Sequence, residues 1–100
     1  MIISQNGNKV LGSASQQELE FPLKYVLKII VDTKIADDKT VKEIEDLFAQ
    51  LKINNNWLYT KPSNKNNFLS YSVEITLPDK NTMDNLYGGL KKIKAIKLAI

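Results

Sequence analysis

Two long segments of the chain alternate between apolar and polar residues with the two-residue period of a β-strand. The first spans residues 23–31 and the second spans residues 68–77, and each places its most apolar residues on one face. The opposite face is half apolar in the first segment and mostly polar in the second. We therefore predict two long strands that each bury one face, with the first strand in the interior of a sheet.

Between these segments, apolar residues recur at spacings of three and four, which is the pattern of an amphipathic helix. They are Val41, Ile44, Leu47, Phe48 and Leu51. Thr40 and Glu43 stand at the spacing of a capping box, in which each side chain hydrogen-bonds to the backbone of the other residue. The sequence thus predicts a helix that begins at Thr40 and ends near Lys52, where three asparagines break it.

A second helix is predicted after the second long strand. Asp79, Asn81 or Thr82 can cap it, and it extends to about Ile93. Its apolar positions again have helical spacing, and they are Met83, Leu86, Tyr87, Leu90 and Ile93. The Gly88-Gly89 pair costs roughly 1 kcal/mol per residue relative to alanine. This helix is therefore expected to depend on packing against the rest of the protein.

Two shorter strands complete the pattern, at residues 57–61 and 95–100, the latter with Ile96, Leu98 and Ile100 alternating. The order β-α-β-β-α-β is that of the ferredoxin-like fold. With right-handed crossovers it predicts an α+β sandwich, a four-stranded antiparallel sheet of order 4-1-3-2 with two helices on one face. One domain is expected at residues 20–100, after a flexible N-terminal leader at residues 1–19 that is rich in Gly, Ser, Gln and Asn.

The composition removes most catalytic and metal-binding chemistry. The chain of 100 residues has no cysteine and no histidine, so it lacks the commonest metal ligands and the commonest general base. Asp32, Asp37 and Asp38 fall in one turn, but their spacing matches no calcium loop, and we interpret them as turn formers. We predict no catalytic residue, no cofactor and no metal site, and therefore not an enzyme.

The charge of the chain comes from 14 basic and 11 acidic residues, a net charge of +3, and every basic residue is a lysine. Without arginine there is no bidentate group for phosphate or guanine. An RNA-recognition module also needs aromatic residues on the open sheet face, where only Phe68 is expected. Since the chain has no apolar run of about 18–20 residues and no secretory signal, we expect a cytoplasmic location and no membrane contact.

The stretch KPSNKNN has the composition of a binding loop. Lys61, Ser63, Asn64 and Lys65 supply donors for an anionic group, and the aromatic Phe68 follows them. The same residue types suit a hairpin connection, because Pro, Ser and Asn form turns and lysines at a sheet edge oppose aggregation. The sequence leaves both interpretations open.

An interface is also predicted at Trp57 and Tyr59, which are expected to share one face of an edge strand. If that face points inward, both residues belong to the core. If it points outward, they join Phe68 in an exposed aromatic patch, which marks a contact with a partner or a second copy.

Several motifs form a set: Lys61-Pro-Ser63 with Lys65 and Phe68, the run from Ser70 to Thr76, the helix positions Leu86-Tyr87, Leu90 and Lys92-Ile93, and Glu20-Phe21-Pro22 at the start of the domain. On the basis of these motifs, residues 19–100 resemble the YbeD-like family of small bacterial proteins. The resemblance implies a ferredoxin-like fold and invites comparison with ACT-type regulatory domains, which sense small metabolites. The Gly88-Gly89 pair departs from the family pattern, since family members more often have helix formers there.

We therefore expect a small non-enzymatic regulatory or protein-interaction module that senses a small metabolite in the manner of ACT-type domains. Its expected partners are another protein or a second copy of the chain, together with a small-molecule ligand. The alternative function is a lysine-dependent nucleic-acid-associated protein, although nucleic acid is not the favoured partner.

Overall fold

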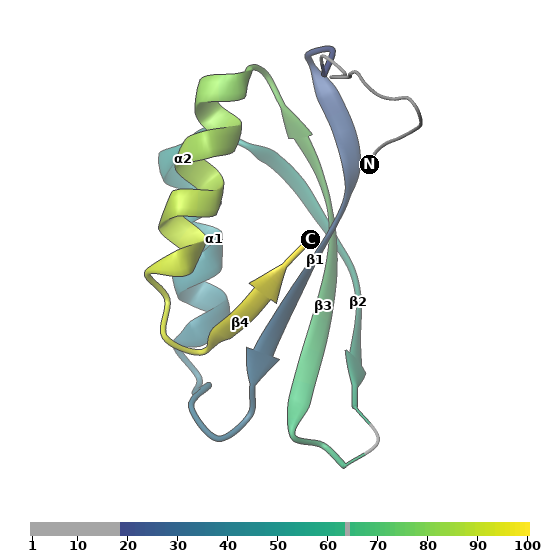
Figure 1. Cartoon of the computed structure of the whole chain (residues 1–100), viewed down its shortest axis with the longest axis vertical. Helices are drawn as coiled ribbons and strands as arrows, with labels where there is room; N and C mark the ends of the chain where they lie inside the picture. The colour runs from purple at the N-terminus through teal and green to yellow at the C-terminus, as the bar shows by residue number, and fades with distance from the viewer. Residues whose placement is uncertain (1–18, 64) are drawn as a thin grey trace, which may run out of the picture.

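Four strands and two helices follow one another in the predicted order: β1 (Leu23–Asp32), α1 (Thr40–Gln50), β2 (Asn54–Pro62), β3 (Phe68–Leu77), α2 (Lys80–Lys91) and β4 (Ile96–Ala99). This computed structural model describes residues 19–63 and 65–100, so residues 1–18 of the expected leader lie outside the described residues. The strands form one antiparallel sheet in the order β2-β3-β1-β4, and both helices lie on one face of it (Figure 1). The predicted ferredoxin-like α+β sandwich is confirmed.

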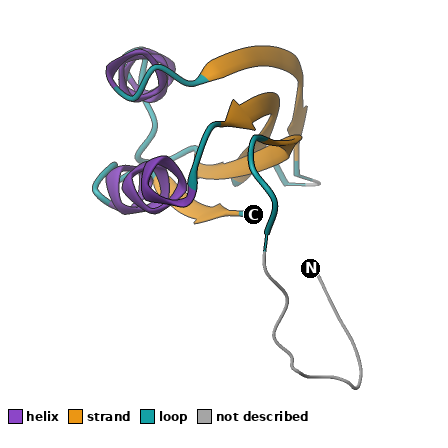
Figure 2. Ribbon diagram, turned by 90° about the horizontal axis from the view of Figure 1, so that it is seen from above, coloured by secondary structure: helices purple, strands orange, loops and turns teal. Residues whose placement is uncertain are grey.

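The core lies between the sheet and the helix layer, which are seen edge-on in Figure 2. β1 and β3 pair along their whole length, from Leu23 opposite Leu77 to Asp32 opposite Phe68. Every second residue of these strands meets the apolar stripes of the helices, and the fully buried members of this core include Leu27, Ile29, Val31, Ile44, Phe48, Val73, Ile75, Leu77 and Leu86. Since full burial of such a side chain contributes about 1.5–3 kcal/mol, these alternating positions hold the fold together.

The two helices begin differently. The predicted capping box at Thr40 and Glu43 is wrong, because Thr40 is already helical and the N-cap residue, Lys39, makes no side-chain cap hydrogen bond. The hydroxyl of Thr40 instead accepts a hydrogen bond from the backbone N–H of Asp37 at 3.0 Å. In α2 the predicted cap at Asp79 is confirmed, since its carboxylate accepts a hydrogen bond from the backbone N–H of Thr82 at 2.7 Å. That hydrogen bond lowers the pKa of Asp79.

The edge strand β2 begins three residues earlier than predicted. Asn54, Asn55 and Asn56, which the sequence suggested as a helix break only, pair with residues 74–76 of β3. An edge strand has one flank and one face in contact with water, so it accepts polar residues that an interior strand would exclude. The polar start of β2 therefore reflects its position in the sheet.

The opposite edge strand, β4, is irregular. Ile96 pairs with Val31 and Leu98 pairs with Ile30, so the register shifts between these two pairs. A bulge of this kind turns the following residue to the other face. Ile96 consequently packs toward the helices. Leu98 lies on the opposite side of the sheet, the open face, which no helix covers in the described structure (Figure 1). The prediction that Ile96 and Leu98 share a face is wrong.

Candidate functional site

The loop between β2 and β3 is a hairpin closed by its own hydrogen bonds. The backbone N–H of Ser63 donates to the carbonyl of Phe68 at 2.9 Å, and the side chain of Ser63 accepts from the N–H of Phe68 at 3.2 Å. Asn66 adopts a positive φ of 57°, which asparagine tolerates better than most residues. The hydroxyl of Thr33 donates to the carbonyls of Asn66 and Asn67 at 2.8 and 3.0 Å, which ties the hairpin to the end of β1.

The predicted binding residues of this loop are divided among different places. Ser63 closes the hairpin, and Lys65 is exposed in the turn. Lys61 lies opposite Ser70 on the open face of the sheet, and Phe68 lies on the same face opposite Asp32. Asn64 lies outside the described residues. Among the described residues of this set, Lys61 and Phe68 reach a common surface, which is a face of the sheet. The loop itself stays a predicted binding site.

Trp57 and Tyr59 do not share a face of β2, contrary to the prediction. Trp57 pairs with Val73, whereas Tyr59 pairs with Ser72, so the register shifts at Leu58. Trp57 points toward the helices and packs edge-on against Phe48 and Tyr71, with ring centroids 6.3 and 5.6 Å apart. Tyr59 lies on the open face. The bulge therefore assigns Trp57 to the core side and Tyr59 to the exposed patch.

The open face carries most of the large apolar side chains that the described part of the chain exposes. They are Val26 on β1, Tyr59 on β2, Phe68 on β3, Leu98 on β4 and Ile100 just beyond it. Ile100 is held there by two backbone hydrogen bonds with Lys28, at 2.8 and 2.9 Å. Exposed apolar side chains that gather on one face mark interaction sites more often than side chains scattered over the surface do.

Charges of both signs lie among these apolar residues. Lys24 and Glu74 approach to 3.8 Å, and Lys97 and Asp32 to 3.9 Å. Because both distances are long and the lysine of each pair is exposed, each pair stabilises the fold by less than about 1 kcal/mol. Lys28 and Lys61 are exposed on the same face. The face is therefore amphipathic and of mixed charge.

Among residues 19–63 and 65–100, Ser72 is the one polar residue of this face that is completely buried. It lies between Lys28 of β1 and Tyr59 of β2 in the sheet register. Its hydroxyl has no hydrogen-bond partner within the described structure. Leaving such a group unpaired costs about 1–3 kcal/mol, so we expect Ser72 to weaken the sheet at the centre of the open face.

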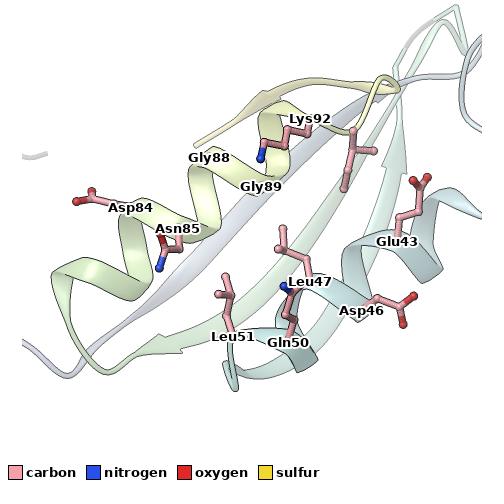
Figure 3. Close-up of a pocket in the computed structure, with 11 residues that line it drawn as sticks. Glu43, Asp46, Leu47, Gln50, Leu51, Asp84, Asn85, Gly88, Gly89 and Lys92 are labelled. Atoms are coloured by element: carbon pink, nitrogen blue, oxygen red, sulfur yellow. The ribbon is translucent and has the colours of Figure 1, made fainter.

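A groove of about 650 Å³ separates α1 from α2 on the outer surface of the helix layer. Leu47 and Leu51 point from α1 into this groove, and Asn85 of α2 points back toward them (Figure 3). Gly88 and Gly89 form the wall on the α2 side. The groove thus has an apolar floor and a wall of bare backbone.

The two glycines in this wall differ in their surroundings. A Cβ atom at Gly89 would come within 2.7 Å of Cδ1 of Leu47, so glycine allows α1 and α2 to approach closely there. A Cβ atom at Gly88 would meet nothing within 4 Å. Packing inside the protein therefore accounts for Gly89 but not for Gly88, which costs roughly 1 kcal/mol in helix propensity.

The rim of the groove carries three carboxylates, those of Glu43, Asp46 and Asp84, and one ammonium group, that of Lys92. Asp46 pairs with Lys42 at 3.4 Å and Asp84 pairs with Lys80 at 3.0 Å. These are exposed pairs between residues four apart on a helix, each worth about 0.3–0.5 kcal/mol. Such pairs can be exchanged for other partners at little cost.

A pair of tyrosine hydroxyls joins β1 to α2. The Oη atoms of Tyr25 and Tyr87 lie 2.6 Å apart, a short hydrogen bond. Burial, followed by this hydrogen bond, raises the pKa of the Tyr25 hydroxyl well above its ordinary value. The contact between Tyr25 and Tyr87 therefore joins the helix layer to the sheet with Tyr25 in its neutral form.

Alkaline solution is expected to weaken this contact. Because the folded-state pKa of Tyr25 exceeds the unfolded one, its stabilising effect is complete below about pH 10 and is lost as the pH rises through the folded pKa. Urea unfolding from pH 8 to 11 should therefore show a steeper loss of stability for the wild-type protein than for Tyr25→Phe. Equal slopes in the two proteins would contradict the assignment.

Neither a metal centre nor a membrane span appears among residues 19–63 and 65–100. No three acidic side chains come together there in a way that could hold an ion. No helix in these residues is long and apolar enough to cross a membrane. Asp32 and Asp37 accept hydrogen bonds from the backbone N–H groups of Lys34 and Lys39, at 2.8 and 2.9 Å, which confirms them as turn formers.

Solved structures similar to this chain share its fold at low sequence identity. The solution structure of protein HP0495 from H. pylori superposes with a TM-score of 0.65 at 10% identity, covering 91% of this chain and 94% of that chain. The C-terminal domain of the MgtC protein from Mycobacterium tuberculosis gives 0.63 at 13% identity, covering 84% and 89%. The ACT domain from GTP pyrophosphokinase of Chlorobium tepidum gives 0.53 at 12%, covering 77% and 94%.

Family membership follows from the sequence itself. A search of curated proteins found no match. A family described as "Protein of unknown function (DUF493)" matches residues 16–100, which is most of the chain and includes every helix and strand. The resemblance to YbeD-like proteins is thereby confirmed, and the chain belongs to the DUF493 family.

Proposed function

We propose that this protein is a small regulatory or protein-interaction module without catalytic activity, and that two copies associate through the open face of the sheet. The observation that carries this proposal is the concentration of exposed apolar side chains on that face, from Tyr59 on one edge strand to Leu98 on the other. Burial of such a surface is the main driving force for association.

The mixed charge of the face favours a second copy as the occupant. Lys24, Lys28 and Lys61 lie on the same surface as Asp32 and Glu74. In a two-fold symmetric dimer each patch meets itself, so a surface with both signs of charge can place its carboxylates against the lysines of its partner. A polyanion such as a nucleic acid would instead require a surface whose charges are positive.

The likeness to an ACT domain supports a further part of the proposal, that the module responds to a small metabolite in the cytoplasm. The likeness concerns the fold alone. Binding of such a ligand to the folded state alone would raise the melting temperature.

Sedimentation velocity on three proteins tests the dimer. The double variant Tyr59→Ser, Leu98→Ser removes two apolar side chains that are 58% and 49% exposed on the open face. Its self-association should be at least about tenfold weaker than that of the wild-type protein, because a few large side chains carry most of the binding energy of such interfaces. Ile35→Ser removes an equally apolar side chain, 44% exposed but in the turn after β1, and should leave association unchanged.

Two results would speak against this proposal. The first is a wild-type protein that stays monomeric at high micromolar concentration, and the second is equal weakening by the Ile35 variant. The alternative function has one supporting observation, the presence of Tyr59 beside Lys61 on the same face as Phe68. If the monomer binds a single-stranded oligonucleotide with steep salt dependence, and loses that binding with Tyr59→Ser, the alternative replaces the dimer.

A further inference from the structure

The groove between α1 and α2 is a second interaction surface on the side of the molecule opposite the open face. We propose that it binds an amphipathic helix of another protein, with an apolar stripe and lysine or arginine residues along its borders. The proposal is independent of the dimer, because none of the residues that line this groove lies on the sheet.

The shape of the groove suits a helix. It is bordered by helices of 11 and 12 residues, which are about 16–18 Å long, the length of about three turns of a partner helix. Leu47, Leu51 and Ile93 are only half buried and offer apolar contacts along its floor. A helix that binds in a groove presents apolar side chains at intervals of three and four residues, which can contact these three side chains.

Gly88 supplies the second argument. Because a Cβ atom there would touch nothing, no contact within the described structure requires glycine at this position. Its effect is to leave the backbone of α2 bare in the middle of the groove wall (Figure 3). A bare backbone allows another helix to approach more closely than a wall of side chains would.

The charge of the rim identifies the kind of helix. Its carboxylates, Glu43, Asp46 and Asp84, outnumber its single ammonium group, although the chain as a whole carries a charge of +3. The lysines that pair with Asp46 and Asp84 are exposed and can be displaced by cations of the partner. A second copy would bring the same carboxylates against one another, and residues 1–18 carry one lysine and one glutamate, so neither supplies the positive charge that the rim requires.

A peptide of defined composition tests this proposal. The probe is a fluorescein-labelled peptide of about 14 leucine and lysine residues with leucines at helical spacing, and the control peptide has glutamate in place of lysine. Fluorescence anisotropy should detect binding of the lysine peptide only. Amide shifts in nuclear magnetic resonance spectra of the 11.3 kDa protein should then change most around Leu47 and Gly88.

Matched variants separate the groove from the rest of the helix layer. Gly88→Met fills the groove and should weaken peptide binding by about tenfold, whereas Asn81→Met, on the same helix outside the groove, should not. Glu43→Gln should weaken binding by about threefold. Glu45→Gln, on the same helix but outside the groove, should have no effect. The melting temperature of each variant establishes that it is folded.

Several outcomes of the binding measurements would overturn the proposal. They are no binding of the lysine peptide, equal binding of the glutamate peptide, and binding that Gly88→Met leaves unchanged. Shifts that cluster on the open face around Val26 and Ser70 instead of the groove would count against it in the same way.

Discussion

Replacement of Phe48 by alanine is expected to lower the free energy of unfolding by about 3–5 kcal/mol. Phe48 is 0% exposed in the last turn of α1 and meets the ring of Trp57 edge-on at 6.3 Å. Its removal takes away the transfer free energy of the ring and leaves a cavity that neighbouring residues fill only in part. Since small domains are stable by about 5–15 kcal/mol, this loss is a large share of the total.

The matched control is Phe68→Ala, which removes the same side chain at a position that is 40% exposed on the open face. It should cost about 1 kcal/mol or less, because little apolar area returns to water and no cavity forms. Urea unfolding of both variants at the same pH measures the difference. Equal costs for the two replacements would mean that Phe48 does not hold α1 on the sheet.

Replacement of Ser72 by alanine should have the opposite sign and raise the free energy of unfolding by about 1 kcal/mol or more. The hydroxyl of Ser72 is fully buried between Lys28 and Tyr59 and has no partner within the described structure. Alanine keeps the shape of the site to within one oxygen atom and removes the group that must be desolvated.

Ser70→Ala, two residues along the same face of β3, serves as the comparison. Ser70 is only half buried, so its hydroxyl keeps access to water and its removal should change stability by less than about 0.5 kcal/mol. Thermal and urea unfolding of both variants provide the measurement. A loss of stability in Ser72→Ala would show that this hydroxyl has a hydrogen-bond partner in solution, for instance a bound water.

The candidate site was only partly accessible from the sequence. Lys61 and Phe68 were singled out, and both lie on the open face, but the face itself is assembled from four strands that are distant in the chain. Tyr59 was expected on the side of Trp57, and the bulge at Leu58 moves it to the other side. The signal was present in the run Trp57-Leu58-Tyr59, since three large apolar residues in succession do not fit a regular alternation.

The groove between the helices was harder to predict from the sequence than the open face. The sequence marked Gly88-Gly89 as a cost to the second helix, and only the distances to Leu47 distinguish the two glycines. Helix spacing placed Leu47 and Leu51 on an apolar face, yet their half-exposed position depends on how far apart the two helices lie. That separation is set by packing between segments about 40 residues apart.

Periodicity by itself determined the number, kind and order of the elements, because repeats of two and 3.6 residues record which face of each element is buried. Together with the handedness of crossovers, this order determined the order of strands in the sheet. The tertiary structure decided what those patterns do not record. Cross-strand pairing introduced the bulges that sent Tyr59 and Leu98 to the open face, and pairing with β3 extended β2 to Asn54. A bulge adds one residue and reverses every face that follows it, so side-chain position near the edges of the sheet depends on partners that the local sequence does not contain.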